Sequence, residues 1–409
     1  GPNCCGAEEA ANYRKRLHEI GAEHFVLETV TSGNVTAKKL CTAFGINITP
    51  FLEAPDEDLY PLLGKLITDE LSKRQKLPQF NTIDDAATLL NKSQNVVVIT
   101  GAGISTSLGI PDFRSKHTGF YSKLLEMGYT DPEEVFDIHN FDEDPRTFYE
   151  LAGSIVPDLK QWTPTHEFIH LLQQKGKLLT NYTQNIDNLE SNAGISTEKL
   201  IQCHGSWATA TCRKCGWKVP GSDIFEDVKA KRVAKCRVCI QRMKNERPGI
   251  KRKRSSNDGK KRKKSRDDSD DDDDGRYDIP EPGVMKPDIT FFGEPLPNMF
   301  FDRITQHDLE KVDLVLVIGT SMKVAPVSEI PRIMPPMVPH IYISLDPVHH
   351  INFDITLLGQ CDTIVSELCK RADWELNHDM ISHDEANVIV PCEGHEGRCK
   401  VYSVPNSSN

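Results

Sequence analysis

The stretch Val96-Val97-Val98-Ile99-Thr100-Gly101-Ala102-Gly103-Ile104-Ser105 decides the fold. Its first five residues, mostly β-branched, predict a buried strand, and the glycines that follow predict a tight turn into a helix. Such a turn suits a dinucleotide phosphate, because glycines let the backbone approach it and a helix start attracts an anion. The usual third glycine of the dinucleotide fingerprint is missing. A plain strand-to-helix turn therefore remains an equal interpretation of this motif alone.

Further short apolar runs alternate with amphipathic helices along the chain. The clearest helix begins at Thr163-Pro164 and ends before Gly176. Apolar strands that alternate with helices predict a parallel sheet covered on both faces, with its ligand at the carboxyl ends of the strands. The other expected strands are residues 177–182, 199–202, 288–292, 313–318 and 340–345.

Composition, motifs and expected elements together divide the chain into seven regions. We expect an α/β protein with a Rossmann-like, dinucleotide-binding large domain and an N-terminal helical extension, and the family resemblance given below implies a small helical and zinc-ribbon domain. The expected regions are an N-terminal extension (1–50), a helical approach segment (51–93), the large domain (94–119, 161–205 and 285–371), the helical part of the small domain (120–160), a cysteine-bearing module (206–244), a charged low-complexity insert (245–284) and a C-terminal tail (372–409).

Polar clusters follow several of the expected strands. Gly109-Ile110-Pro111-Asp112-Phe113-Arg114 brings an aromatic ring and a guanidinium that could clamp a cofactor, and Gly319-Thr320-Ser321 would form the other half of a dinucleotide crevice. Thr183-Gln184-Asn185-Ile186-Asp187 could bind a polar ligand, or could equally cap a helix. His204, before Gly205, is placed as a general base, although a single histidine is more often structural. Convergence of these clusters at one sheet edge favours a binding site.

Four of the twelve cysteines form two Cys-x-x-Cys pairs, at Cys212/Cys215 and Cys236/Cys239, separated by a spacer of twenty residues. This spacing is typical of four thiolates around a tetrahedral zinc ion. Disulfides or redox-active cysteines are the alternatives. Because four protein ligands close the coordination shell, we expect a structural zinc rather than a catalytic one.

The overall charge hides a strong segregation. The formal net charge is −11, yet residues 251–266 hold ten basic side chains, and seven aspartates follow at positions 267–274. The basic run indicates a nuclear import signal or a nucleic-acid contact, and a solvated linker is the alternative. The acidic remainder disfavours a folded body that binds DNA, and it would attract basic substrates. With no apolar run near the roughly 20 residues of a membrane span, we expect no membrane partner.

Seven motifs, in their order and spacing, resemble those of the sirtuins. The resemblance extends from about residue 50 to 372 apart from the charged insert, and more narrowly it points to the nuclear silent-information-regulator branch of fungi. The motifs are GAGIS (101–105), GIPDFRS (109–115), TQNID (183–187), HG (204–205), the two cysteine pairs, KPDITFFGE (286–294) and GTS (319–321).

The resemblance implies NAD-dependent deacetylation of acetyl-lysine on proteins, with acetylated histone tails as the expected substrates. NAD would be consumed as a co-substrate to give nicotinamide and O-acetyl-ADP-ribose, and one structural zinc ion would stabilise the small domain. The resemblance further implies a nuclear location, a role in chromatin silencing and transcriptional repression, and silencing-complex subunits as partners. Mono-ADP-ribosyl transfer and a largely non-catalytic NAD-sensing scaffold remain the alternatives.

The resemblance also assigns roles to individual residues. His204 and Asn185 would be catalytic, with His204 as the general base. The cysteines Cys212, Cys215, Cys236 and Cys239 would bind zinc, and Thr290, Phe292, Gly293 and Glu294 would bind the substrate peptide as an added strand. NAD would be contacted by Gly101, Ala102, Gly103, Ser105, Asp112, Phe113, Arg114, Gln184, Asn185, Asp187, Gly319, Thr320, Ser321, Ser344, Leu345, Asp346 and Cys361.

Two residues depart from the pattern that the resemblance leads us to expect. Ser344 stands where relatives usually carry an asparagine that contacts the adenine ribose, and Thr290 stands where a valine is commoner beside the substrate tunnel. The first change shortens the side chain that would contact the adenine ribose of NAD, and the second change is milder.

Overall fold

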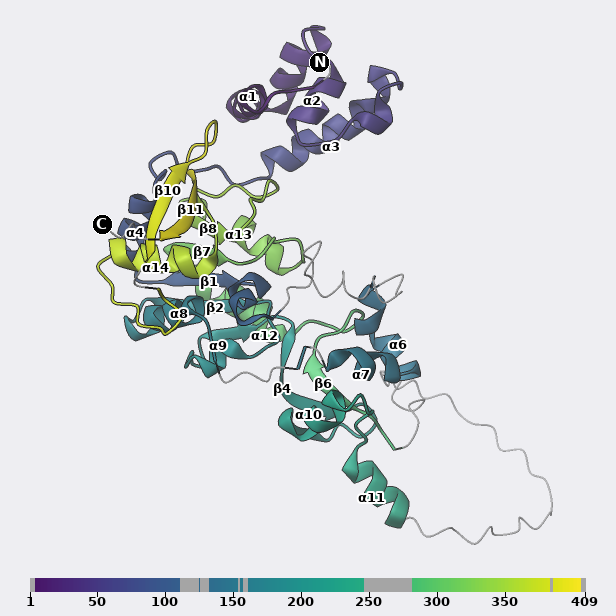
Figure 1. The fold of residues 1–409 in the computed structure, drawn as a ribbon. Coiled ribbons are helices and arrows are strands. Elements are labelled where there is room, and N and C mark those ends of the chain that lie inside the picture. The colour runs from purple at the N-terminus through teal and green to yellow at the C-terminus, as the bar shows by residue number, and fades with distance from the viewer. Residues whose placement is uncertain are drawn as a thin grey trace, which may run out of the picture.

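A computed structural model of the chain describes residues 4–110, 125, 132–153, 155–156, 161–245, 282–382 and 385–405. Figure 1 shows three parts along the long axis of the molecule: a group of N-terminal helices, a central sheet with its covering helices, and a smaller module that carries β4 and α10. Within the described residues, no helix combines the length and the apolar character needed to cross a bilayer.

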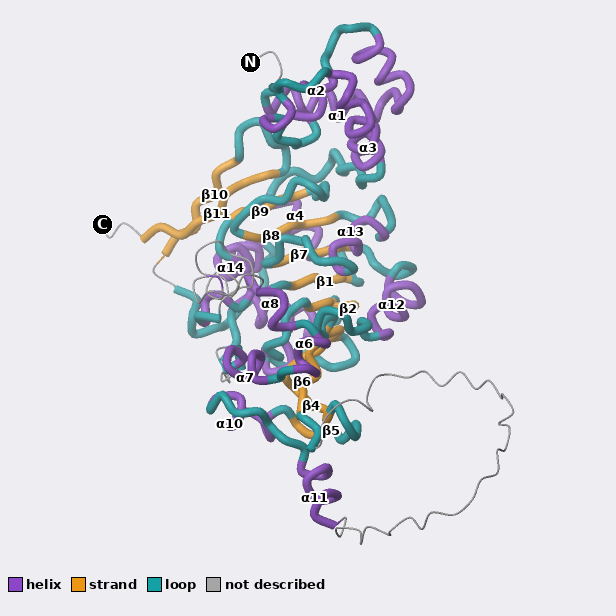
Figure 2. Tube along the Cα trace, turned by 90° about the vertical axis from the view of Figure 1, so that its right-hand side faces the viewer, coloured by secondary structure: helices purple, strands orange, loops and turns teal. Residues whose placement is uncertain are grey.

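The central sheet has the strand order β10-β11-β9-β8-β7-β1-β2-β3. β1 pairs in parallel with β2 on one side and with β7 on the other, and all of its residues are buried. This confirms the parallel sheet expected from the continuous apolar runs. Figure 2 shows its strands stacked as a ladder between the N-terminal helices and the small module. The parallel strands are β1 (Val96–Thr100), β2 (Leu178–Thr183), β3 (Leu200–Gln202), β7 (Leu314–Ile318), β8 (His340–Ser344) and β9 (Ile355–Leu358).

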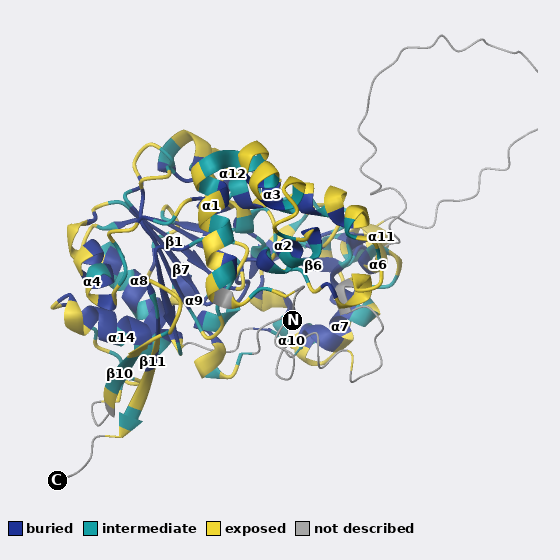
Figure 3. Ribbon diagram, turned by 90° about the horizontal axis from the view of Figure 1, so that it is seen from above, coloured by how far each residue is buried: buried dark blue, intermediate teal, exposed yellow. Residues whose placement is uncertain are grey.

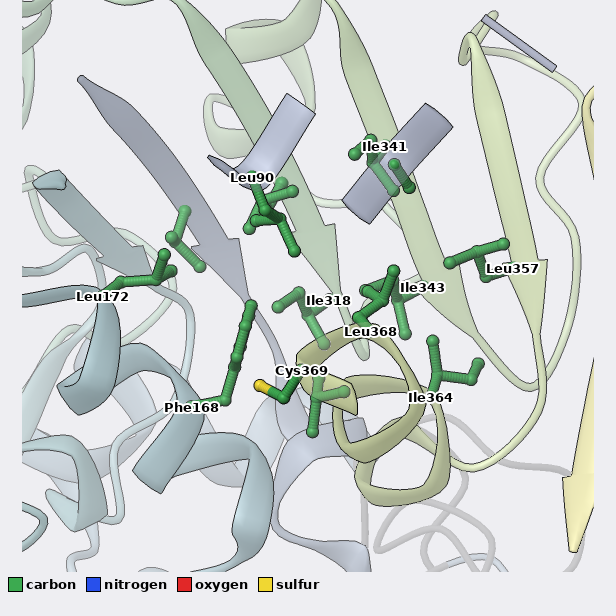
Figure 4. Packing of buried hydrophobic residues seen from close by; sticks show 14 of the residues in the cluster. Leu90, Phe168, Leu172, Ile318, Ile341, Ile343, Leu357, Ile364, Leu368 and Cys369 are labelled. Atoms are coloured by element: carbon green, nitrogen blue, oxygen red, sulfur yellow. The ribbon is translucent and has the colours of Figure 1, made fainter. Parts of the chain in front are cut away.

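Helices cover both faces of this sheet, so the strands lie buried between them (Figure 3). On one face, α4 (Ile83–Lys92), α8 (Pro164–Gln174) and α14 (Cys361–Arg371) pack against the strands. Figure 4 shows Leu90, Phe168 and Leu368 of these helices meeting Ile318 and Ile343 of the sheet. The other face is covered by α12 (Asn298–Arg303) and by α13 (Ile330–Ile333).

Side-chain caps fix where two of the covering helices begin. Thr82 caps α4 in a capping box with Asp85, and Thr163 caps α8 in a capping box with His166. Each cap satisfies backbone N–H groups that have no partner inside the helix. The Thr163 hydroxyl also donates to the Ile104 carbonyl at 2.9 Å, which ties α8 to the loop after β1.

The strand expected at 288–292 is wrong in both position and partner. The chain instead forms β6 (Met285–Ile289), which belongs to a separate three-stranded sheet of the small module, with order β5-β4-β6. It pairs antiparallel with β4 (Gly205–Cys212), and β5 (Lys218–Pro220) pairs antiparallel with the other side of β4. An apolar run alone does not specify which strand will pair with it, and here the pairing with β4 places the segment in the sheet of the small module.

The helix expected to start at the glycine turn after β1 is also corrected. The chain after β1 instead makes two single 3-10 turns, η4 (Ala102–Ile104) and η5 (Thr106–Leu108). Gly109 then ends the second turn with a φ of 79°, a conformation that glycine adopts without strain.

The polar C-terminal segment extends the sheet, although the sequence analysis assigned it no structure. It forms a hairpin of β10 (Glu385–Pro391) and β11 (Arg398–Pro405), and β11 pairs in parallel with β9. Cys399 and Val401 point into the core while Lys400 between them is exposed. Such alternation is typical of a strand with one face on the core and the other in water.

The N-terminal helices form a unit with a core of its own. The expected helical extension contains α1 (Ala7–Val26), which packs against α2 (Ala37–Ala43) and α3 (Tyr60–Leu71). Leu17, Phe25, Leu40, Leu63 and Ile67 share one apolar cluster. The structure therefore joins residues that the sequence analysis divided at position 50.

A buried ion pair fastens this N-terminal unit to the sheet. Just after α3, the Arg74 guanidinium donates to both carboxylate oxygens of Asp354 at 3.0 and 2.8 Å. Asp354 also accepts from the backbone N–H of His340, the first residue of β8, at 2.7 Å. Bidentate geometry of this kind is the strongest form of a charged hydrogen bond, so the connection is fixed in orientation.

In its described residues, the small module combines its antiparallel sheet with four helices and an aromatic core. Phe148, Trp207 and Phe291 are almost fully buried in this core. The rings of Phe148 and Trp207 are stacked, with 6.2 Å between their centres. The helices are α6 (Ile138–Glu143), α7 (Arg146–Ala152), α10 (Ser222–Lys229) and α11 (Arg237–Asn245).

Candidate functional site

The turns after β1 and β7 meet at the carboxyl edge of the sheet. Gly103 N–H donates to the Gly319 carbonyl at 2.8 Å, and a Cβ on Gly103 would lie 2.7 Å from the Gly319 Cα. A Cβ on Gly101 would likewise lie 2.6 Å from the Thr320 Cβ. Both glycines are therefore needed for the two turns to touch.

One backbone donor of the first turn is left for a ligand. The N–H groups of Gly101, Gly103, Ile104 and Ser105 all donate to carbonyls of the protein. The N–H of Ala102 donates no hydrogen bond within the described part of the chain. An unpaired N–H at a glycine-rich turn suits a phosphate oxygen, so this turn fits a dinucleotide.

The segment after β2 joins the same edge. Gln184 donates from its side-chain amide to the Thr320 hydroxyl at 3.1 Å, and the buried Asn185 side chain donates to the Gly101 carbonyl at 3.2 Å. Ser105 donates to Asp187 at 2.7 Å. These three side chains therefore connect the turns of β1, β2 and β7.

Only Asp187 matches the alternative of a helix cap. Its second oxygen accepts from the Leu189 N–H at 3.1 Å, where α9 (Leu189–Asn192) begins. Gln184 and Asn185 instead face the phosphate turn and the second glycine turn, as the previous contacts show.

His204 lies between β3 and β4, at the same edge of the sheet. Its Nδ1 lies 3.1 Å from the Gln184 carbonyl oxygen, which can only accept a hydrogen bond. Nδ1 therefore carries the ring proton, and the lone pair lies on Nε2. Burial lowers the pKa of His204, and the bond to Gln184 opposes this only in part. The ring is thus neutral near pH 7 with a free base nitrogen.

Two buried carboxyl groups lie beneath this site. Burial raises the pKa of Asp187, and burial together with the charge of Asp187 raises the pKa of Glu190 to about 8. Glu190 approaches the Thr100 hydroxyl at 3.5 Å with one oxygen, while its other oxygen has no partner among the described residues. Since two adjacent buried carboxylates repel each other, Glu190 remains protonated at neutral pH.

Replacing Glu190 by glutamine is expected to reduce the pH dependence of stability. Between pH 4.5 and about 8 the folded chain keeps a proton on Glu190 that the unfolded chain has released. The free energy of unfolding therefore falls as pH rises through this window, by up to ~1.4 kcal/mol per pH unit. Glutamine stays neutral, so the variant should gain stability relative to the natural chain between pH 5 and pH 8. Denaturant unfolding at both values measures this gain.

The exposed Glu198 supplies a matched control for this prediction. Glu198→Gln should leave the pH dependence as in the natural chain. Equal pH dependence of Glu190→Gln and the natural chain would show that Glu190 is ionised in the folded state.

The residues expected to bind peptide lie beside His204. Thr290 N–H donates to the His204 carbonyl at 2.8 Å. Phe292 pairs with the helical part of the small module, because its N–H donates to the Phe136 carbonyl at 2.7 Å and its carbonyl accepts from Ile138 at 3.0 Å. Gly293 has a φ of 86°, which favours glycine. The segment 290–294 thus spans the space between the sheet edge and the small module.

The remaining expected contacts lie in three places. Ser344 ends β8, where its carbonyl accepts from Gly359, and the Tyr342 hydroxyl joins the carbonyls of Thr320 and Asp346 at 2.9 and 3.1 Å. Leu345 and Ser321 are exposed. Cys361 begins α14, and burial raises the pKa of its thiol to about 12, so it is not a reactive thiolate. Asp112, Phe113 and Arg114 lie outside the described residues.

Sequence reasoning missed the role of Asp362. This carboxylate accepts from the Ser107 hydroxyl at 2.6 Å, from the Thr165 hydroxyl at 2.6 Å and from the Thr165 N–H at 3.0 Å. It therefore ties the loop after β1 to α8 and α14. An aspartate in the first turn of a helix is common because it interacts favourably with the helix dipole, so no sequence signal pointed to this contact.

The four paired cysteines form one cluster. Their sulfur atoms all lie within 4.8 Å of one another, with 3.8 Å between Cys212 and Cys239 and 3.6 Å between Cys215 and Cys236. Thiolates about 2.3 Å from a tetrahedral zinc ion lie about 3.8 Å apart. All twelve cysteines of the chain are free thiols, which contradicts the disulfide alternative. The donor set and its spacing therefore fit a zinc ion with a closed shell.

The chain on either side of residues 246–281 returns to this cluster. Cys236 N–H donates to the Gly283 carbonyl at 2.8 Å, and a Cβ on Gly283 would lie 2.6 Å from the Cys212 sulfur. Lys235 and Val284 form an isolated bridge next to it. The charged run that we expected to be a solvated insert lies outside the described residues.

The fold, the joined glycine turns, His204 and the cysteine cluster agree with one family model. That model, the Sir2 family, matches residues 101–326. The chain belongs to the Sir2 family. Membership explains why motifs spread over about 220 residues meet at one sheet edge, and it confirms the resemblance found in the sequence.

Several relatives in the Sir2 family are fungal. The chain is 45% identical over 374 residues to the NAD-dependent histone deacetylase sir2 of Schizosaccharomyces pombe. This aligned stretch covers 91% of the chain and 77% of the relative. It is 46% identical to the NAD-dependent protein deacetylase HST1 and to the NAD-dependent histone deacetylase SIR2, both of Saccharomyces cerevisiae. Those matches cover 77% of this chain but only 60% and 55% of the two relatives.

Proposed function

We propose that this Sir2-family protein removes acetyl groups from lysine side chains in an NAD-dependent reaction, most directly on histone tails. The observation that carries the proposal is the position of His204. Its neutral ring lies at the edge where the glycine turns meet, and its carbonyl holds Thr290 of the peptide segment. The names of the fungal relatives support the same activity.

NAD would bind across the joined turns of β1, β2 and β7. When bound, it supplies the ribose carbon that accepts the acetyl oxygen, and it leaves as nicotinamide and O-acetyl-ADP-ribose. Ala102 would donate its backbone N–H to a phosphate, while Gln184, Asn185 and Asp187 orient the ribose and the nicotinamide. Gly101, Gly103 and Ser105, together with Gly319, Thr320 and Ser321, would line the crevice.

The adenine end of NAD would lie along the ends of β8 and α14. Ser344, Leu345, Asp346 and Cys361 would contact it there, and Asp112, Phe113 and Arg114 would act from the segment outside the described residues. Ser344 offers a shorter side chain than asparagine, so we expect it to make the weaker contact with the adenine ribose.

His204 would act as the general base. Its Nε2 lone pair can accept the proton of a ribose hydroxyl, and burial keeps the ring neutral for this task. Asn185, fixed by its bond to the Gly101 carbonyl, would orient the reacting groups. Thr290, Phe292, Gly293 and Glu294 would hold the substrate peptide.

Zinc would be structural. Four cysteine ligands leave no open position for water, so the ion would tie β4 to α11 and would take no part in the acetyl transfer. The acidic body suits basic histone tails as substrates. We further infer that the protein acts in the nucleus with silencing-complex subunits, and that the basic run 251–266 is its nucleic-acid or import contact.

One assay tests the proposed activity against the alternatives. The protein is incubated with NAD labelled in its adenylate part and with an acetylated histone-tail peptide, and the mass of the peptide is followed. Loss of the acetyl mass supports deacetylation. Label attached to protein without loss of acetyl mass would support mono-ADP-ribosyl transfer instead. NAD binding with neither change would support a scaffold.

A further inference from the structure

A lysine with a buried ammonium group lies four residues before the segment expected to bind the peptide, residues 290–294. Lys286, on β6, is 5% exposed, and its Nζ donates to the carbonyls of Ile289 at 2.6 Å and Pro287 at 3.3 Å. Nζ also lies 2.8 Å from a carboxylate oxygen of Glu294 and 4.1 Å from the centre of the Phe291 ring. Burial of a charged ammonium is unfavourable unless such partners surround it.

The partner of Lys286 closes the peptide segment on itself. The Glu294 oxygen that faces Lys286 also accepts from the Phe291 N–H at 2.8 Å, and the Glu294 N–H donates to the Phe291 carbonyl at 3.0 Å. All of these contacts arise within nine residues, 286–294. The turn from β6 through Glu294 is therefore built around one buried ion pair.

This turn determines where the segment stands relative to His204. At one end Thr290 is bonded to the His204 carbonyl, and in the middle Phe292 is paired with Phe136 and Ile138. The Phe292 side chain remains 43% exposed, although it is large and apolar. Such a side chain beside a catalytic edge is available to contact a substrate.

A buried ion pair is a poor way to gain stability. Well-packed apolar residues of similar volume are often as stabilising, because both charges must be taken out of water. The ion pair at Lys286 does fix the orientation of the Glu294 carboxylate, because it holds this group against the Phe291 N–H. Among the described residues, Lys286 contacts neither the glycine turns nor the residues after β2.

We propose that Lys286 is a positioning residue for the acyl-lysine peptide, which it serves by fixing segment 290–294 through Glu294. The inference rests on the proposed deacetylase function and assigns the residue to peptide binding rather than to NAD binding. Lys286 touches neither substrate. It acts through the shape of the segment that the peptide would pair with as an added strand.

The test is Lys286→Met in the full chain with zinc bound. Methionine keeps the length of the stem and its packing on Phe291, but it removes the ammonium that orients Glu294. We expect the KM for an acetylated histone-tail peptide to rise about tenfold or more, while kcat and the KM for NAD change by less than about twofold. Thermal unfolding and zinc content are measured on the same sample.

Lys218→Met is the matched control. Lys218 lies on β5 of the same sheet and pairs with Asp288 at 3.0 Å, but its side chain is 61% exposed. Exposed ion pairs contribute little, so both KM values should remain as in the natural chain.

The double variant Lys286→Met/Glu294→Gln separates positioning from simple loss of packing. Glutamine can still accept from the Phe291 N–H, and it carries no unpaired charge. A peptide KM below that of Lys286→Met supports the proposal. An unchanged peptide KM in Lys286→Met, or equal changes in both KM values with loss of zinc, would overturn it. Absence of acetyl loss with the natural chain would instead refute the proposed function.

Discussion

His204→Ala is expected to lower the turnover of acetylated peptide by about 10²–10⁴-fold, the usual contribution of a general base. The reason is that Nε2 carries the lone pair, while Nδ1 is committed to the Gln184 carbonyl. Alanine removes the proton acceptor but leaves the glycine turns and the cysteine cluster in place. Steady-state kinetics at saturating NAD and peptide measure the loss, with zinc content and NAD binding measured on the same protein.

The control is His24→Ala, since His24 is an exposed residue of α1 in the N-terminal unit. It should leave kcat unchanged. If His204→Ala keeps more than about a tenth of the natural kcat, the base is a different group. The pH profile adds a second readout, because the buried His204 should lose activity only below its lowered pKa.

Removal of zinc is expected to unfold the small module rather than only block the reaction. The cluster joins β4, α11 and the chain around Gly283, and structural zinc contributes about 10–16 kcal/mol in small zinc peptides at neutral pH. Trp207 is almost fully buried in this module, so its fluorescence should shift to the red when a chelator is added. Cys236→Ser should give the same change without chelator.

Cys4→Ser is the control for this experiment, because Cys4 is exposed and lies outside the cluster. It should bind about one zinc ion per chain and fold as the natural chain does. A chain that is stripped of zinc but keeps its tryptophan emission and its secondary structure would contradict the structural role.

The central sheet could be predicted because its strands are continuous runs of apolar residues. Val96–Thr100 is buried along its whole length, and Leu314–Ile318 is as well, so continuous apolar runs identified them and the parallel sheet followed. The glycine turns, His204 and the cysteine pairs were predicted because chemistry restricts which residue types can occupy such positions.

Other features depend on contacts that no local pattern encodes. The expected strand at 288–292 moved into a second sheet because β4 pairs with Met285–Ile289. The hairpin Glu385–Pro405 was missed because strands that expose one face to water carry many polar residues. The core that α3 shares with α1 and α2 was not foreseen, because its residues lie far apart in the chain.

The residues of the site that were not predicted contact the predicted residues and influence their charge or orientation. Glu190 was missed because its effect arises from burial next to Asp187, which only the fold brings about. Lys286 was read as part of a motif, and its role becomes visible only where its ammonium meets Glu294. Burial and pairing are tertiary properties, so a sequence pattern indicates the residue but not its environment.

The stoichiometry of the reaction tests the account most directly. Nicotinamide, deacetylated peptide and O-acetyl-ADP-ribose are quantified together in one reaction, with and without NAD. We predict equal amounts of the three products, with no deacetylated peptide when NAD is omitted, because His204 serves an acetyl transfer to NAD and the four cysteines leave zinc no open position. Release of free acetate without consumption of NAD would contradict the account.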